Sequence, residues 1–412
     1  MADRRVLLLF LLTATSASAH GLPPQSLSIA PSPWAPKGLV VSTTFGALVT
    51  DDRCTWEWIC PEVLGLGPRE VPTWVATASG TLYAAAFSGL FVSRDRGCSF
   101  ERHPTFEGRG AFAVVEAEGS IFVTTGRFGA RNGLFESNDD GRTFTGANLS
   151  SDTLFFSGVR VVGDRRVVSA WYFEPRRLAL FVSDDRGATF TEIDHTASLP
   201  GGSVFTVHAV DAVTPQLVYA SIVNDAVTPE QGTLLRSVDG GRTFTPVLTG
   251  AGRVSSLVQD GTGWWVALGE RVFGSANGID FSVLDSPTQR ACVARVDAQT
   301  LVCGRQPGED GFSVANVTGA VSPLLTWDRI SGPRTCPSGS STATTCAVSW
   351  PVERAELGLA VDHVATCGGE VPAPIAPPLT CGCFGAPGGA AVVLALLFFR
   401  VRRGRVESAN RR

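Results

Sequence analysis

The sequence predicts an all-β fold, a β-propeller of seven four-stranded blades, with six blades as the alternative. A nine-residue motif recurs almost unchanged, as SNDDGRTFT from Ser137, SDDRGATFT from Ser183 and SVDGGRTFT from Ser237. Short apolar runs bounded by glycine or aspartate precede each copy. The 412 residues include 45 Gly and 25 Pro but a single Met, a composition typical of many turns and few helices.

The aromatic residue that closes the motif marks a regular period along the chain. It falls at positions 56, 100, 144, 190, 244, 281 and 327. The copies at Trp56 and Phe281 are one residue short, and Trp327 is a weaker echo without the aspartate or glycine. A period of this size indicates an array of identical supersecondary units, so seven markers predict seven blades over residues 26–334.

Each period predicts four antiparallel strands. Around the motif that ends at Phe100, the runs TWVATAS, GTLYAAAF and GLFVS come before it and FERHP follows. Such runs are short and rich in β-branched and aromatic residues, as strands are. The inner runs are apolar throughout because stacked blades cover both faces of each sheet. SLSIAPSP from Ser26 supplies the innermost strand of the first blade.

The motif itself predicts the hairpin between the last two strands of a blade. Its aspartate accepts hydrogen bonds from backbone N–H groups, its glycine supplies positive φ, and its aromatic ring packs between sheets. The four good copies supply these candidate residues: Ser93, Asp95, Gly97, Phe100, Ser137, Asp139, Gly141, Phe144, Ser183, Asp185, Gly187, Phe190, Ser237, Asp239, Gly241 and Phe244.

This hairpin resembles the Asp-box, or BNR repeat, of sialidases, sortilin-type receptors and related propellers. In that family the box is structural and lies away from the functional face, so the resemblance implies that Asp139, Asp185 and Asp239 are not catalytic. A calcium loop built on the paired acids would need a longer series of ligands. The chain has neither an HExxH motif nor a C-x-x-C pair, so we expect no metal and no cofactor.

The N-terminus predicts export. Arg4 and Arg5 precede a short apolar run at residues 6–12, and Ala-Ser-Ala at 17–19 supplies a cleavage site before His20. We therefore expect residues 1–19 to be a signal peptide rather than a membrane anchor, because the apolar run is too short to span a bilayer.

Because cysteines of exported proteins commonly form disulfides, we expect disulfides rather than metal sites among the ten cysteines. Cys292 and Cys303 flank two short runs around a turn, which predicts a disulfide between directly opposite strand positions. Cys336 and Cys346 flank a Ser/Thr/Gly-rich stretch, and we expect them to close it as a loop. The sequence does not pair the remaining cysteines before the tail: Cys54, Cys60, Cys98 and Cys367.

The segment after the propeller divides into three parts. Residues 335–370 predict a cysteine-containing extension that packs on the propeller, with a short helix starting near Pro351. Residues 371–380 are a proline-rich linker. Residues 381–412 begin with 19 uncharged residues, which predict a membrane-spanning helix, and then carry an arginine cluster that would stay cytoplasmic.

This tail resembles the myxobacterial C-terminal sorting signal called MYXO-CTERM. The resemblance implies a membrane protease that processes the tail and a lipid anchor on Cys381 or Cys383. An unprocessed tail would leave a single-pass membrane protein. Either outcome predicts a propeller on the cell surface of a bacterium, with the membrane as a partner.

Three functions remain open on the sequence alone. A net charge of −4 argues against nucleic acid as a partner. We expect a non-enzymatic binding or scaffold propeller for an unknown protein or glycan, with a sialidase-like glycoside hydrolase as the alternative. Sialidases use a tyrosine nucleophile, yet Tyr83, Tyr172 and Tyr219 lie in predicted second strands and no Arg-Ile-Pro motif follows the N-terminus.

The third function is an endoglucanase-like hydrolase with two aspartates across a cleft. Such enzymes usually need a second propeller, for which this chain has no room. Four tryptophans are candidates for carbohydrate contacts, although core packing is the more common role of such strand residues: Trp56, Trp58, Trp264 and Trp265. His103, His195, His208 and His363 are isolated in the sequence and receive no role.

Overall fold

The computed structural model describes residues 23–67, 70–284, 290–305, 313–317 and 322–365. They belong to the first of two compact units, Met1–Ile375, and the second unit is Ala376–Arg412. The predicted signal peptide, linker and tail lie outside the described residues, as do Cys367, Cys381 and Cys383. Among the described residues, no helix combines the length and the apolar character that crossing a bilayer requires.

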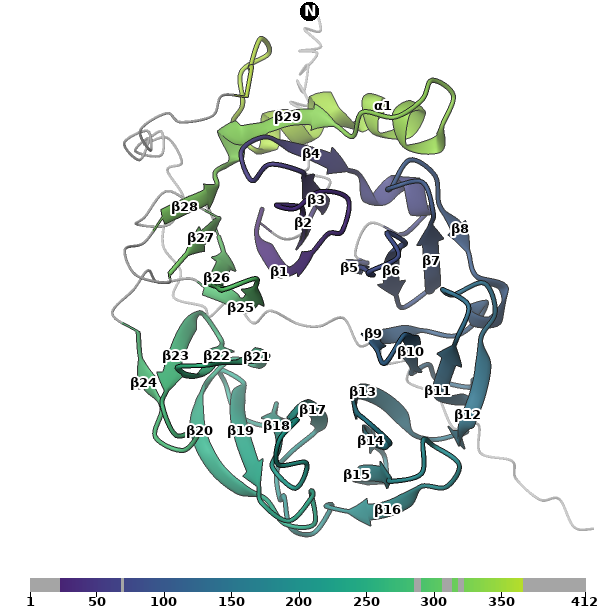
Figure 1. Ribbon diagram of the computed structural model, residues 1–412, viewed down its shortest axis with the longest axis vertical. Helices are drawn as coiled ribbons and strands as arrows, with labels where there is room; N and C mark the ends of the chain where they lie inside the picture. The colour runs from purple at the N-terminus through teal and green to yellow at the C-terminus, as the bar shows by residue number, and fades with distance from the viewer. Residues whose placement is uncertain (1–22, 68–69, 285–289, 306–312, 318–321, 366–412) are drawn as a thin grey trace, which may run out of the picture. The chain divides into compact units, whose positions relative to one another are not determined.

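Seven β-sheets follow one another along the chain and form a seven-bladed β-propeller, which confirms the predicted fold and blade count (Figure 1). Blade 1 contains β1 (Ser26–Pro31), β2 (Leu39–Thr43), β3 (Gly46–Thr50) and β4 (Trp56–Ile59). Blade 2 contains β5 (Thr73–Ala76), β6 (Leu82–Ala86), β7 (Gly89–Ser93) and β8 (Glu101–Arg102). Blade 3 contains β9 (Ala111–Ala117), β10 (Ser120–Thr125), β11 (Asn132–Ser137) and β12 (Thr145–Ser151).

The remaining blades repeat this order. Blade 4 contains β13 (Phe155–Val162), β14 (Arg165–Phe173), β15 (Arg176–Ser183) and β16 (Thr191–Asp194). Blade 5 contains β17 (Val204–Val210), β18 (Val218–Asn224), β19 (Gln231–Ser237) and β20 (Thr245–Ala251). Blade 6 contains β21 (Val254–Asp260), β22 (Gly263–Leu268), β23 (Arg271–Ser275) and β24 (Ser282–Val283). Blade 7 contains β25 (Arg290–Val296), β26 (Gln299–Gly304), β27 (Val314–Asn316) and β28 (Ser322–Leu325).

The hydrophobic core lies between neighbouring blades. Phe122 of blade 3, for example, shares a buried cluster with Phe156 and Val168 of blade 4. Serine hydroxyls add polar links, since Ser169 Oγ of blade 4 accepts the backbone N–H of Val207 in blade 5 at 2.9 Å. Each blade thus buries both faces, which is why its middle strands lack an alternating pattern.

Blade 1 carries a fifth strand from the C-terminal side of the propeller. β29 (Ile330–Pro333) runs parallel to β4, with Ile330 opposite Trp56. The helix α1 (Ser341–Glu356) follows and packs against β4, β29 and the short helix η1 (Pro61–Leu64). Figure 1 shows β29 and α1 on the outer side of blade 1.

The helix does not start near Pro351, so that prediction is wrong. It begins ten residues earlier, where Ser340 Oγ accepts the backbone N–H of Ala343 as an N-cap, and Pro351 lies inside it. Tertiary contacts with blade 1 offset the hydrogen bond that an internal proline removes.

The loop closure expected from Cys336 and Cys346 is also wrong, because each cysteine has a distant partner. Cys346 is bonded to Cys60 and Cys336 to Cys98, across 286 and 238 residues of sequence. These two bonds attach the extension to blades 1 and 2. Cys292 and Cys303 form a disulfide between the paired strands β25 and β26. Cys54 is disulfide-bonded as well.

Candidate functional site

Strand order gives each blade two distinct ends. The hairpin between the first two strands and the repeated nine-residue turn lie at one end, which we call the motif end. The hairpin between the second and third strands and the connection to the next blade lie at the other, which we call the loop end. The repeated turn follows the third strand in blades 2 to 5, as at Ser93 and Ser137.

The repeated turn is closed by its own side chains. Ser137 Oγ donates to Asp139 Oδ1 at 2.7 Å and accepts the N–H of Gly141 at 2.8 Å. The N–H and hydroxyl of Thr143 donate to the two oxygens of Asp139 at 2.9 and 2.7 Å. The turns that begin at Ser93, Ser183 and Ser237 repeat these bonds almost unchanged. This arrangement gives the aspartate a structural task.

The electrostatics of the turn favour an ionised aspartate. The hydroxyl and then the N–H of Thr189 lower the pKa of Asp185 to about 2, and the equivalent groups of Thr143 lower the pKa of Asp139. A carboxyl group that stays ionised well below neutral pH suits a permanent hydrogen-bond acceptor better than a proton donor.

The repeated turns also contact the preceding blade. Tyr83 of blade 2 is buried, and a Cβ atom on Gly141 of blade 3 would lie 2.2 Å from its hydroxyl oxygen. Tyr219 of blade 5 donates to the carbonyl of Gly278 in blade 6 at 2.8 Å. Burial raises the pKa of both tyrosines. Two of the three tyrosines therefore pack blades together.

Two histidines have the same kind of role. The Nε2 atom of His103 is hydrogen-bonded to the carbonyl of Arg142 at 3.2 Å, and that of His195 to the carbonyl of Gly241 at 2.9 Å. Each ring also packs edge-on against the aromatic residue that closes the turn of the next blade. His208 is buried, and burial lowers its pKa to about 3. The described residues contain no group of three or more side chains suited to a metal ion.

The loop end carries a different feature, a group of aromatic side chains that we call the aromatic shelf. Its members come from three successive blades, at loop or strand-end positions that adjoin the loop end: Phe87, Phe112, Phe128, Phe155, Trp171 and Tyr172. Phe87, Phe112 and Phe128 are 50%, 37% and 49% exposed, which is unusual for rings of this size. Large apolar side chains that are exposed near one another are common at interaction sites.

Ring contacts join the five members of the shelf other than Phe87. Phe155 is buried beneath the others, with its ring centroid 4.7 Å from that of Phe128 and 5.1 Å from that of Trp171. The Phe112 and Tyr172 rings lie 6.3 and 5.9 Å from the same centre. Most of these pairs are edge-to-face, the geometry that aromatic rings prefer.

Two glycines make this packing possible. A Cβ atom on Gly126 would lie 1.9 Å from Cε2 of Phe112 and 3.0 Å from Cβ of Phe155. A Cβ atom on Gly110 would lie 3.1 Å from the carbonyl oxygen of Phe87. The hairpin backbone can approach the rings only where the chain has no side chain.

Asn132 fixes the hairpin that presents Phe128. Its side chain is buried, accepts the N–H of Arg127 at 2.8 Å and donates to the carbonyls of Arg127 and Leu154 at 3.0 and 3.1 Å. One amide thus ties residues 127–131 to the third strand of blade 3 and to the residue that precedes the first strand of blade 4. The exposed ring is therefore held on an ordered hairpin.

Charged side chains border the shelf. The guanidinium of Arg127 lies 5.8 Å from the centre of the Phe87 ring, and Arg131 pairs with Asp152 at 3.5 Å with both side chains well exposed. An apolar centre with a polar rim is the usual composition of a recognition surface.

The tryptophans chosen from the sequence lie elsewhere. Trp56, Trp58 and Trp264 are buried in the blades, and only Trp265 is half-buried. The sequence places Tyr172 in a predicted second strand and marks none of the three exposed phenylalanines as candidates. The available signal was an aromatic residue inside the glycine- and arginine-rich hairpin GRFGAR at residues 126–131.

Comparisons with known proteins support the propeller fold but do not show a family for this chain. No model of a known protein family matches this chain. It is 27% identical over 161 residues to a xyloglucanase of Hypocrea jecorina (strain QM6a), which covers 38% of this chain and 18% of that protein. The chain thus spans less than a fifth of the curated relative it matches.

Two solved structures illustrate the structural likeness. A puromycin hydrolase mutant has a TM-score of 0.51 at 12% identity, covering 78% of this chain and 55% of its own. A GH74 enzyme of Niastella koreensis has a TM-score of 0.47 at 16% identity, covering 76% and 53%. At such identities the likeness shows the fold alone, and the class that fold and topology define is the seven-bladed β-propeller.

Proposed function

We propose that this propeller binds extracellular polysaccharide through the aromatic shelf at its loop end. The observation that carries the proposal is a preorganised group of rings from three blades, of which those of Phe87, Phe112 and Phe128 are exposed, with polar side chains along its border. Sugar rings have apolar C–H faces and hydroxyl edges, so an aromatic surface with a polar rim complements them.

The similarity to a xyloglucanase supports a glycan over a protein ligand. We propose that the repeated turns are Asp-box repeats. Their hairpins stabilise the motif end, and the loops at the loop end are then available for recognition. Binding by a rigid scaffold loses little conformational entropy, which suits a surface with few contacts per sugar.

Glycoside hydrolysis is the second candidate, and the xyloglucanase match is the observation that favours it. Hydrolysis would require an acid and a second carboxyl group on opposite sides of the bound sugar. The repeated-turn aspartates at the motif end do not fit this task, because their oxygens are occupied by their own turns.

One experiment separates the two candidates. The purified protein is incubated with xyloglucan, cellulose, mixed-linkage β-glucan and sialylated glycans, and both retention on the polysaccharide and release of reducing ends are measured. Retention without release supports binding, whereas release from any of them establishes hydrolysis. A protein that neither is retained by nor cleaves any of them contradicts both candidates.

We also propose that the protein is exported and anchored at a bacterial cell surface through a MYXO-CTERM tail. The sequence features of the two termini support this proposal. Mass spectrometry of the mature protein tests it, since a C-terminus near Cys381 or Cys383 with an added lipid mass is expected. An unlipidated chain that runs to Arg412 in a soluble fraction would contradict it.

A further inference from the structure

An arginine side chain joins the innermost strands of blades 4 and 5. Arg160 belongs to β13, and its Nε donates to the carbonyl of His208 on β17 at 2.5 Å. Its Nη1 donates to the carbonyl of Val159 at 2.7 Å. Figure 1 shows that β13 and β17 are the strands of their blades nearest to the centre of the ring of blades. We call the place where these two strands meet the β13–β17 seam.

The seam is held in a fixed geometry by two β-bulges. His208 is the extra residue of a bulge in β17, because the register with β18 shifts between Val207 and Ala209. Such a residue is left out of the strand ladder, so its carbonyl can accept from a side chain. Ser157 is the extra residue of a bulge in β13, and its hydroxyl donates to the carbonyl of Phe205 on β17. Two side-chain hydrogen bonds therefore join the inner strands.

The guanidinium of Arg160 has no acidic partner among the residues that the structure describes. Neither β13 nor β17 contains an aspartate or a glutamate. The carboxylate of Glu116 on β9 accepts a backbone N–H of blade 2, and that of Asp211 accepts two N–H groups of its own loop. Burial lowers the pKa of Arg160 to about 10, and no negative charge offsets this effect. A cation removed from water without a counter-charge costs free energy.

Part of the guanidinium is unused by the protein. Of its five N–H groups, one on Nε and one on Nη1 donate to carbonyls, and the others have no acceptor among the described residues. The side chain is half-buried, so it remains partly accessible to solvent. A guanidinium holds its N–H groups in a fixed plane that matches two oxygens of a carboxylate or a phosphate. The free donors and the uncompensated charge therefore suit the same class of ligand.

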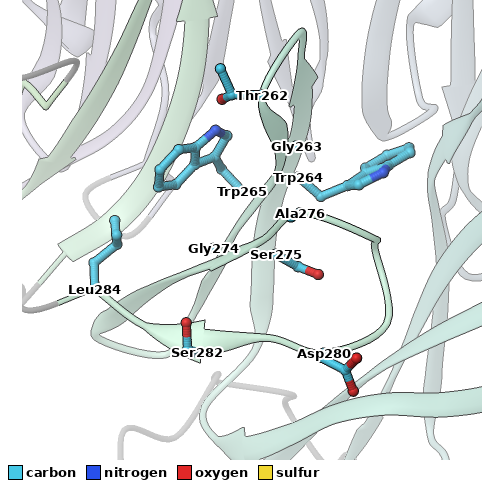
Figure 2. A pocket seen from close by; sticks show the side chains of 10 residues that line it. All are labelled: Thr262, Gly263, Trp264, Trp265, Gly274, Ser275, Ala276, Asp280, Ser282 and Leu284. Atoms are coloured by element: carbon cyan, nitrogen blue, oxygen red, sulfur yellow. The ribbon is translucent and has the colours of Figure 1, made fainter.

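The seam is separate from the two other surfaces that could bind a ligand. Arg160 lies further along β13 than Phe155 of the aromatic shelf, by about 16 Å for five strand residues. The pocket of about 290 Å³ in blade 6 has no cation in its lining, and its Trp265 and Asp280 side chains lie on opposite sides of the hairpin (Figure 2). A pocket with a carboxylate and no cation disfavours an anion.

We propose that Arg160 binds a small oxyanion at the β13–β17 seam, either a free carboxylate or phosphate ion or the acidic group of a glycan. The oxyanion would accept the N–H groups of Nη1 and Nη2 that the protein leaves unused. Its negative charge would compensate the partly buried cation. The proposal does not rest on the function of the aromatic shelf.

The test measures calorimetric binding of acetate, phosphate and methyl glucuronide to the full chain at low ionic strength, where a charge pair is least screened. We expect at least one of these anions to bind with a Kd in the millimolar range. Arg160→Gln should weaken that binding about tenfold or more, because it removes both the charge and the paired donors. Binding of acetate or phosphate identifies a free ion as the ligand, whereas binding of the glucuronide alone identifies an acidic glycan.

Three controls make the result specific to Arg160. Methyl glucoside has no carboxylate, so any binding of it should be unchanged in Arg160→Gln. Arg186→Gln removes the same charge from an exposed side chain of blade 4 that pairs with Asp164, and it should bind anions as wild type does. Arg160→Lys keeps the positive charge without the planar set of donors and should weaken binding about threefold or more. Thermal unfolding shows whether each variant is folded.

Three results would overturn the proposal. The first is that none of the three anions binds the wild-type protein. The second is that a folded Arg160→Gln or Arg160→Lys variant keeps the wild-type affinity. The third is that Arg186→Gln loses as much affinity as Arg160→Gln, which would show that only the net charge of the protein matters.

Discussion

Gly126 shows how much of the aromatic shelf depends on one residue without a side chain. Its φ is ordinary, so the requirement for glycine comes from the rings of Phe112 and Phe155 rather than from backbone conformation. The sequence alone marks this residue only as part of a hairpin, because the ring it touches lies fourteen positions earlier in the chain and the other lies in the next blade.

We predict that Gly126→Ala displaces Phe112, lowers the free energy of unfolding by about 1–3 kcal/mol and weakens polysaccharide retention. Urea unfolding and retention assays measure the two effects. Gly146→Ala is the matched control, because no atom lies within 4 Å of its Cβ position. Equal behaviour of the two variants would show that the close packing at Gly126 does not matter.

The aspartates of the repeated turns give the protein a defined response to acid. The pKa of Asp185 is lowered to about 2, so its stabilising contribution is present above the ordinary aspartate pKa near 4 and is lost as the pH falls toward 2. We predict that Asp185→Asn unfolds at a lower midpoint urea concentration than wild type at pH 7. The difference between the two midpoints should become smaller as the pH falls from 4 to 2.

The matched control for this prediction is Asp184→Asn, which changes the neighbouring exposed carboxylate. It should give a smaller difference in the midpoint of urea unfolding at pH 7, since the Asp184 carboxylate is exposed although its partner Arg165 is largely buried. If the difference in midpoint between Asp185→Asn and wild type stays constant down to pH 2, the ionised form of Asp185 is not what stabilises the turn.

At the scale of single elements, α1 contains a buried glutamate that faces other acids. Burial, followed by the charges of Glu356 and Glu62, raises the pKa of Glu353 to about 8. The folded state therefore holds a proton that the unfolded state releases near pH 4.5. Stability from this group is present below that value and is lost as the pH rises through 8.

We predict that Glu353→Gln matches wild type at pH 5 and exceeds its free energy of unfolding by on the order of 2–4 kcal/mol at pH 9. Chemical unfolding at the two pH values measures the difference. The variant Glu356→Gln, at a half-buried position, serves for comparison and should change stability less. A Glu353→Gln variant that is less stable than wild type at pH 9 would contradict the buried, protonated state.

An element could be predicted well where its sequence signal is local, and poorly where its position depends on residues far away in the chain. The motif that ends at Phe144 is local, so the sequence identified both its turn and the strands around it. The start of α1 was misplaced because Pro351 is a strong local signal, while the contacts that keep the helix together come from blade 1.

At the scale of the whole molecule, disulfides join parts of the propeller chain that are far apart in the sequence. The Cys60–Cys346 disulfide joins positions 286 residues apart, whereas Cys292–Cys303 closes only 11. Sequence could suggest the second pair from two adjacent strands but not the first, because nothing local to Cys346 indicates that α1 lies against blade 1.

We predict that Cys60→Ser/Cys346→Ser lowers the free energy of unfolding by about 2–5 kcal/mol, because the bond restricts a long segment of the unfolded chain. Urea unfolding under non-reducing conditions measures it. Cys292→Ser/Cys303→Ser should cost less, since its loop is short. A larger loss in the short-loop variant would contradict this account of how the propeller is stabilised.

The shelf also belongs to the whole-molecule scale, because three blades contribute to it and no single stretch of sequence contains it. Calorimetric titration with an oligosaccharide from the best-retained polysaccharide tests the central claim most directly. We predict that Phe128→Ala weakens binding about tenfold, since removing one stacking ring costs roughly 1–2 kcal/mol, while Val238→Ala at the motif end has no effect. Unchanged affinity in Phe128→Ala would contradict the shelf as the binding site.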